Sequence, residues 1–153
     1  MITTYIIPFA VTICATLSFA ILFTAPKDQY LYCALTGGAG YLTYLILLNQ
    51  FQAEPATASL FATLILTLLS RIFSVIRKNP VTVYLVAGIF PLVPGAGIYY
   101  TSYYLIMNEP ELFSKSGFDT FKIAGAISLG IIFGLAVPQR FFRMLQALLP
   151  SKK

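Results

Sequence analysis

The sequence has no histidine and no tryptophan, and it is poor in charged residues. Only 10% of its residues are charged, whereas a soluble domain usually carries about 25%. With 58% hydrophobic residues and a mean hydropathy of +0.83, the 153-residue chain is typical of a multi-span membrane protein with a single membrane domain. The net charge of +5 does not indicate a nucleic-acid-binding protein, because the basic residues are few and lie at the ends of apolar segments.

Groups that ligate metals or perform catalysis are scarce in this sequence. The two cysteines, Cys14 and Cys33, lie in separate apolar segments, which predicts packing roles and excludes a disulfide framework or a metal-ligand spacing. We recognise no hydrolase constellation and no phosphate-binding loop, so we expect neither an enzyme nor a bound cofactor. No acidic residue lies inside an apolar segment. Because proton-driven carriers usually need such a group, either acids in the loops or a partner protein would have to supply it.

Five apolar segments predict an all-α, polytopic membrane protein. They cover residues 2–23, 30–48, 56–76, 81–107 and 121–137, and each is long enough to cross a bilayer. The polar stretches between them, residues 26–28, 49–55, 77–80 and 108–120, are typical of turns between adjacent helices. The first segment lacks the basic region of a secretory signal, so we interpret it as a retained span.

The basic residues predict the orientation of the chain. They gather in the first and third loops and in the carboxyl-terminal tail, whereas the second loop carries only Glu54 and the fourth is mixed. An odd number of spans then places the amino terminus outside and the carboxyl terminus in the cytoplasm. Residues 139–149 carry Phe and Leu on one helical face and Arg and Gln on the other, which predicts a short helix in the cytoplasmic interface. A frayed continuation of the fifth span is the alternative.

The fourth segment is interrupted near its midpoint by two prolines and two glycines. As one helix its roughly 27 residues would run about 40 Å, longer than the hydrocarbon core of a bilayer at about 30 Å. Each proline removes a backbone donor and frees the carbonyl four residues earlier, so the run Pro91-Leu92-Val93-Pro94-Gly95-Ala96-Gly97 predicts a broken crossing. Open backbone at that depth survives only where it is buried in protein or lines a wet cavity. A simple proline kink repaired by neighbouring helices is the alternative.

The break predicts a binding site. A helix restarting there would point its first amides and its positive dipole end at a carboxylate, while freed carbonyls could accept an ammonium group. We therefore expect an amino acid or a small dicarboxylate as the substrate. The residues expected at this site are Ala87, Phe90, Pro91, Pro94, Gly95, Ala96, Gly97, Tyr99 and Tyr100.

The third segment carries hydroxyl side chains at steps of three and four, which places them on one helix face: Ser59, Thr63, Thr67, Ser70 and Ser74. They either line a polar path, with Thr63 and Thr67 contacting the substrate, or bond back to their own helix. Arg71 lies beside this stripe. It either extends to the headgroups or meets an anionic substrate or an acid of a partner.

Small residues predict close helix contacts in two other segments. The second segment contains Gly37, Gly38 and Gly40, and the fifth contains Ala126, Gly130 and Gly134 at intervals of four. Such patterns let two helix backbones approach each other. Whether the facing helices belong to this chain or to another is open at this point.

Residues 91–101, PLVPGAGIYYT, resemble the signature of the threonine/serine exporter (ThrE) family. The resemblance is to the small subunit of the family, or to the carboxyl-terminal membrane half of its fused members. Pro8 in the first span, residues 33–40 at the start of the second, and Arg71 and Pro80 before the break fit in order and spacing. The resemblance covers most of the chain.

The resemblance implies a multi-pass subunit in the bacterial inner membrane that works with a larger membrane subunit. Members of the family export threonine and serine or, in a related branch, succinate. Two other classes stay open for this chain. It could be an assembly subunit that only stabilises its partner, or it could form a channel as a homo-oligomer.

Overall fold

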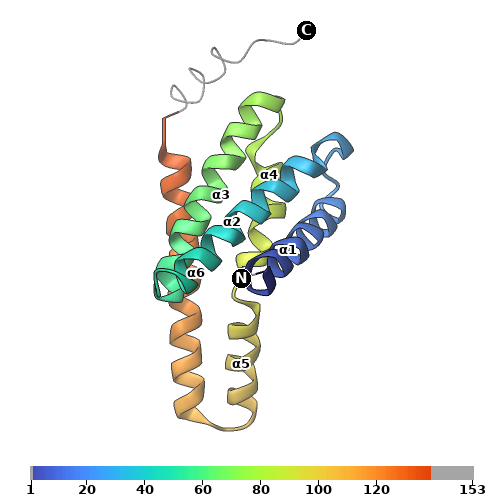
Figure 1. Cartoon of the computed structure of the whole chain (residues 1–153). Helices are drawn as coiled ribbons and strands as arrows, with labels where there is room; N and C mark the ends of the chain where they lie inside the picture. Colours follow the sequence, from blue (N-terminus) through green and yellow to red (C-terminus); the bar gives the residue numbers. More distant parts are fainter. Residues whose placement is uncertain (1, 139–153) are drawn as a thin grey trace.

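The structure, a computed structural model, describes residues 2–138, and all its regular elements are helical. In chain order they are α1 (Ile2–Leu22), the 3₁₀ turn η1 (Lys27–Gln29), α2 (Tyr30–Asn49), α3 (Pro55–Arg77), α4 (Val81–Ile89), the 3₁₀ turn η2 (Phe90–Leu92), α5 (Gly95–Ile106) and α6 (Pro110–Ala136). Helices α1 to α4 pack together with one end of α6, and α5 projects from them alongside the other end of α6 (Figure 1). The all-α prediction is confirmed. The interfacial helix predicted for residues 139–149 lies outside the described residues.

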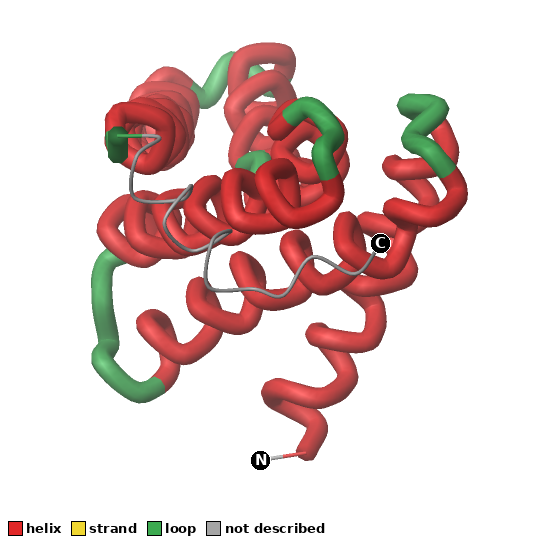
Figure 2. The backbone as a smooth tube through the Cα atoms, turned by 90° about the horizontal axis from the view of Figure 1, so that it is seen from above, coloured by secondary structure: helices red, strands yellow, loops and turns green. Residues whose placement is uncertain are grey.

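The helix ends follow the local chemistry of the sequence. Pro55 and Pro110 are the first residues of α3 and α6. The N–H group of a first residue has no acceptor within the helix, so proline, which lacks this group, costs no hydrogen bond there. Lys78 after α3 and Asn108 after α5 adopt the left-handed conformation, with φ of 55° and 58°, that commonly ends a helix. Short loops connect the helices of the described residues (Figure 2).

The turn predicted over residues 108–120 is wrong for most of its length. Helix α6 begins at Pro110, eleven residues before the predicted start of the fifth span at residue 121. Serine, lysine and aspartate lower the hydropathy of this stretch, but its small side chains pack on α5. Thr101 Oγ1 donates to Ser116 Oγ at 3.1 Å, and a Cβ atom on Gly117 would lie 3.3 Å from Cγ2 of Thr101. Contact with α5 thus stabilises a helix where hydropathy indicates a loop.

Helices α3 and α6 run parallel. Thr63 lies against Gly130, and four residues further along both helices Thr67 lies against Gly134. Because the chain travels in the same direction in α3 and α6, α4 and α5 together must carry it back. We infer that the pair Val81–Leu92 and Gly95–Ile106, bent by 49°, is one broken crossing and not a re-entrant loop.

Within residues 2–138, four helices are long and apolar enough to span a membrane, and the bent pair brings the number to five. The number agrees with the five predicted spans. It rests on the length and composition of the helices.

Helix α6 extends beyond α3 at one end. Lys122 forms an ion pair of 3.3 Å with Glu54, the residue just before α3, so the part of α6 from Pro110 to Lys122 runs about 18 Å past the start of α3. Helix α5 accompanies it there (Figure 1). None of the residues of α5 is buried, and Ile106 at its end is 80% exposed. The projecting hairpin therefore offers apolar surface to lipid or to another protein.

The helices of the bundle approach closely through glycine. A Cβ atom on Gly37 of α2 would lie 2.3 Å from Oγ1 of Thr16 on α1, and one on Gly40 would lie 2.9 Å from Cδ1 of Leu66 on α3. Gly88 of α4 packs against the backbone of Gly37. The glycines of the second segment thus face helices of this same chain.

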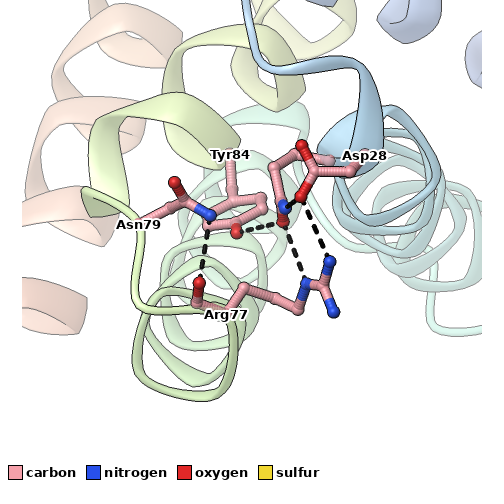
Figure 3. Close-up of polar contacts among 5 residues, drawn as sticks. Asp28, Arg77, Asn79 and Tyr84 are labelled. Carbon is pink, nitrogen blue, oxygen red and sulfur yellow. Dashed lines mark hydrogen bonds and ion pairs between the residues drawn. The ribbon is translucent and has the colours of Figure 1, made fainter.

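A hydrogen-bonded cluster ties η1 to the end of α3 and the start of α4 (Figure 3). The buried Tyr84 hydroxyl donates to Oε1 of the buried Gln29 at 2.7 Å, and Nε of Arg77 donates to the same oxygen at 3.3 Å. Arg77 also pairs with Asp28 at 3.2 Å. These contacts hold the first half of the broken crossing in place at this end of the bundle.

Candidate substrate site at the helix break

The chain passes from η2 to α5 through two residues. Val93 is extended, with φ −61° and ψ 130°, and Pro94 has φ −75° and ψ 59°. The latter values are those of an inverse γ-turn, across which the Gly95 amide donates to the Val93 carbonyl at 2.7 Å. The break predicted in the fourth segment from its prolines and glycines is confirmed.

Two backbone N–H groups at the start of α5 donate to no residue of the described chain. The first helical bond runs from the Ile98 amide to the Pro94 carbonyl at 3.0 Å. In the part of the chain that the structure describes, the amides of Ala96 and Gly97 have no acceptor. Together with the positive end of the helix dipole, they favour an anion at this position.

The break does not leave the Phe90 carbonyl unpaired, and in this respect the prediction is wrong. The amide of Val93 donates to it at 3.2 Å, because η2 turns back on itself. The Phe90 ring stacks on Phe19, with ring centroids 4.2 Å apart. Ala87 is 1% exposed and packs in the core with Cys33. Neither Phe90 nor Ala87 is among the residues that line the cavity at the break.

A cavity of about 270 Å³ lies against the break. Its polar lining comes from Tyr41 and Tyr44 on α2 and Ser59 on α3, and Ile123 of α6 also lines it. Residues of the break complete the wall: Pro91, Leu92, Val93, Pro94, Ala96 and Gly97. Pockets for drug-sized ligands measure about 300–1,000 Å³, so this cavity suits a small solute.

The structure brings four of the expected site residues to this cavity: Pro91, Pro94, Ala96 and Gly97. Gly95 begins α5, but it is not among the residues that line the cavity. Tyr100 lines a neighbouring hollow together with Gly97. Tyr99 is 63% exposed and packs against other tyrosines of α5.

Thr63 and Thr67 lie in the contact between α3 and α6. Their hydroxyls donate back to the carbonyls of Ser59 and Thr63, both at 2.7 Å. A Cβ atom on Gly130 would lie 2.0 Å from Oγ1 of Thr63. The interpretation in which these hydroxyls bond to their own helix therefore describes the structure, while Ser59 at the start of the stripe lines the cavity.

Arg71 is buried and directed at the carboxyl end of α6. One of its terminal nitrogens donates to the carbonyls of Gly134 at 3.0 Å and Leu135 at 2.8 Å, and also to that of Val137. A cation at this end of a helix is favoured by the dipole and satisfies carbonyls that have no helical partner. The side chain thus lies at the contact between α3 and α6, and it is not among the residues that line the cavity at the break.

Tyr41 and Tyr44 were not predicted as site residues. Their rings lie 5.9 Å apart, and neither hydroxyl forms a hydrogen bond with another residue between 2 and 138. A signal was present in the sequence, because two tyrosines three residues apart within an apolar helix need partners for their hydroxyls. What the sequence could not show is that α2 brings them to the break.

The helices and the bent pair at the break define an all-helical, polytopic membrane protein. A family model described as Threonine/Serine exporter, ThrE, matches residues 8–137, and the chain belongs to this family. An uncharacterized protein of Haemophilus influenzae is 28% identical over 128 residues, which make up 81% of this chain and 43% of that protein. The chain thus corresponds to less than half of that relative. No solved structure matches it.

Proposed function

We propose that this chain is the small subunit of a bacterial inner-membrane exporter and binds its substrate at the break before α5. The substrate is threonine, serine or a small carboxylate such as succinate. The observation that carries the proposal is the composition of the cavity wall. It includes Ala96 and Gly97, whose amides have no acceptor among the described residues, and the hydroxyl-bearing residues Tyr41, Tyr44 and Ser59. The amides donate to a carboxylate, and the hydroxyls donate to or accept from its other polar groups.

The chain works with a larger membrane subunit. Two observations support this part of the proposal. The matched region is 43% of the Haemophilus influenzae relative, and the hairpin of α5 and α6 exposes apolar side chains such as Ile98 and Leu105. In the membrane the amino terminus faces outward and the carboxyl terminus lies in the cytoplasm, as the basic loops indicate.

Threonine efflux tests the site. Cells that produce this chain together with the large subunit are loaded with labelled threonine, and efflux is followed at several internal concentrations. Replacing Tyr44 by Phe removes one hydroxyl from the cavity, so we expect the KM to rise about fivefold while the amount of complex is unchanged. Tyr103→Phe is the matched control, because Tyr103 lines neither the break cavity nor the neighbouring hollow at Tyr100.

The other two classes predict different results. In an assembly subunit, Tyr44→Phe would change the yield of complex and leave the KM as it is. In a homo-oligomeric channel, the purified chain alone would conduct solute in liposomes. Either result would contradict the proposed carrier role.

A further inference from the structure

An open groove with a volume of about 540 Å³ runs along one side of the α5–α6 pair. Helix α5 contributes Ile98 and Ser102 to its wall, and α6 contributes Phe121, Ala124 and Ser128. Ile98 is 52% exposed and Phe121 is 75% exposed, so none of the described residues fills the groove.

Charged residues indicate which part of the groove lies in the membrane. Glu54 precedes α3 and Arg77 ends it, and the 23 residues of α3 run about 34 Å, close to the hydrocarbon thickness of about 30 Å. Because Lys122 pairs with Glu54 at 3.3 Å, it marks the same boundary on α6. Most of the projecting hairpin therefore lies beyond the hydrocarbon core, which agrees with the charges of Glu111 and Lys115 in it.

The groove crosses this membrane boundary. Ile98 and Ser102 line it on the hairpin, whereas Ala124 and Ser128 follow Lys122 in the apolar part of α6. Lipid tails can cover only the second part, and a water-soluble protein can cover only the first. A helix that crosses the membrane and continues into the water covers both parts.

The groove also adjoins the helix break. Val93 and Pro94 line both the groove and the break cavity. At these two residues the chain leaves the helical hydrogen-bond pattern, and within a membrane such backbone occurs only where protein covers it or where it lines a wet cavity. A protein helix in the groove covers the break and leaves the break cavity free for a solute.

We propose that this groove holds a membrane helix of the larger subunit, and that this helix continues beyond the hydrocarbon core beside the hairpin. The proposal rests on the proposed function and assigns the surface through which its two subunits meet. The side chains that the helix directs into the groove are apolar, because they contact Ile98 and Phe121.

The Haemophilus influenzae relative supports the larger subunit as the source of this helix. The region that this chain matches makes up only 43% of that relative. In that protein a region similar to this chain is therefore joined to further sequence in one molecule.

Photo-crosslinking tests the proposal in membranes from cells that produce this chain with the larger subunit. The photoreactive amino acid benzoylphenylalanine replaces Ser102 on the hairpin or Ala124 in the membrane part of the groove. Leu129 is the control position, because it is 46% exposed on α6 and does not line the groove. We expect adducts with the larger subunit from both groove positions and few from the control.

Four results would overturn the proposal. The complex could form while neither groove position reacts with the larger subunit, or both positions could react only with a second copy of this chain. A reaction at Ser102 alone would favour a segment of the partner that stays in water. A reaction at Ala124 alone would favour a helix that ends within the membrane.

Filling the groove tests the same contact by another route. Ala124 is exposed in this chain, so Ala124→Trp places its ring in the groove without disturbing the fold. We expect recovery of the larger subunit with the affinity-tagged chain to fall about tenfold or more, at an unchanged amount of this chain in the membrane. Leu129→Trp adds the same side chain outside the groove and should leave recovery unchanged. Equal recovery with the two variants would contradict the proposal.

Efflux from the same cells separates this inference from the proposed function. Adducts at both groove positions without any threonine efflux would contradict the export function and support the docking surface. Efflux by a complex that gives no adducts at the groove would contradict the docking surface alone.

Discussion

Gly97 lies so close to Thr120 that a Cβ atom on the glycine would be 2.4 Å from Oγ1 of the threonine. The contact joins the first turn of α5 to α6 beside the break cavity. Gly95, two residues earlier, has no atom within 4 Å of its Cβ position and no positive φ. The two glycines of the break therefore differ, because close packing requires only the second.

Replacing each of these glycines by alanine tests this difference. Gly97→Ala forces Thr120 to move, and overpacking of this kind destabilises a protein by about 1–3 kcal/mol. We expect a lower thermal unfolding temperature and weaker threonine export. Gly95→Ala is the matched control and should keep both. If Gly97→Ala retains full stability and export, the contact has no structural role.

A second substitution, at Thr120, tests the same contact when it is combined with Gly97→Ala. Thr120→Ala removes the hydroxyl and the methyl group that the new Cβ atom would meet. The double variant should therefore regain part of the stability that Gly97→Ala loses. Purely additive effects of the two substitutions would contradict direct contact between them.

Gly130 should be intolerant of alanine, because its Cβ position lies 2.0 Å from Oγ1 of Thr63 and 2.6 Å from the carbonyl oxygen of Leu60. A backbone carbonyl cannot rotate away, so α3 and α6 would have to separate. We expect Gly130→Ala to reduce the free energy of unfolding in detergent by about 2 kcal/mol or more. Gly125→Ala on the same helix meets nothing within 4 Å and should raise it slightly through its higher helix propensity. Equal effects of the two substitutions would contradict the parallel α3–α6 contact.

Arg71 should stabilise the protein without contacting the substrate. Arg71→Met removes donors from the carbonyls at the end of α6, which we expect to reduce the free energy of unfolding by about 2 kcal/mol or more. The fraction of Arg71→Met protein that still folds should have an unchanged KM for threonine. A KM raised tenfold at normal yield would instead show that Arg71 contacts the substrate.

Reporter fusions at the two ends of the chain test the broken crossing as a single span. The parallel direction of α3 and α6 requires α4 and α5 to cross once together. The two ends should then lie on opposite sides of the membrane. With the orientation that the basic loops indicate, we expect an active periplasmic reporter at the amino terminus and an active cytoplasmic reporter at the carboxyl terminus. Activity of the same reporter at both ends would indicate an even number of crossings and contradict this topology.

The sequence is sufficient to predict those features that depend on local chemistry. Hydropathy locates the apolar helices, and Pro94 with its neighbouring glycines locates the break within a residue or two. The first turns of α6 were missed because hydropathy measures affinity for lipid, whereas Pro110 to Asp119 is helical through contact with α5.

The site was harder to predict because it joins elements that are distant in the sequence. The break residues Ala96 and Gly97 were expected, since proline and glycine act on the chain next to them. Tyr44 and Ser59 come from other helices, and no local pattern indicates which face of α2 or α3 meets the break. The role of Arg71 also depends on α6, whose carboxyl end lies more than sixty positions away in the sequence.

An experimental structure of the exporter with threonine bound measures the central claim most directly. We predict a gap in the fourth crossing between Leu92 and Gly95, with the threonine carboxylate about 2.7–3.2 Å from the amides of Ala96 and Gly97. A continuous helix through this region, or threonine bound elsewhere with the cavity beside Tyr44 empty, would contradict the account.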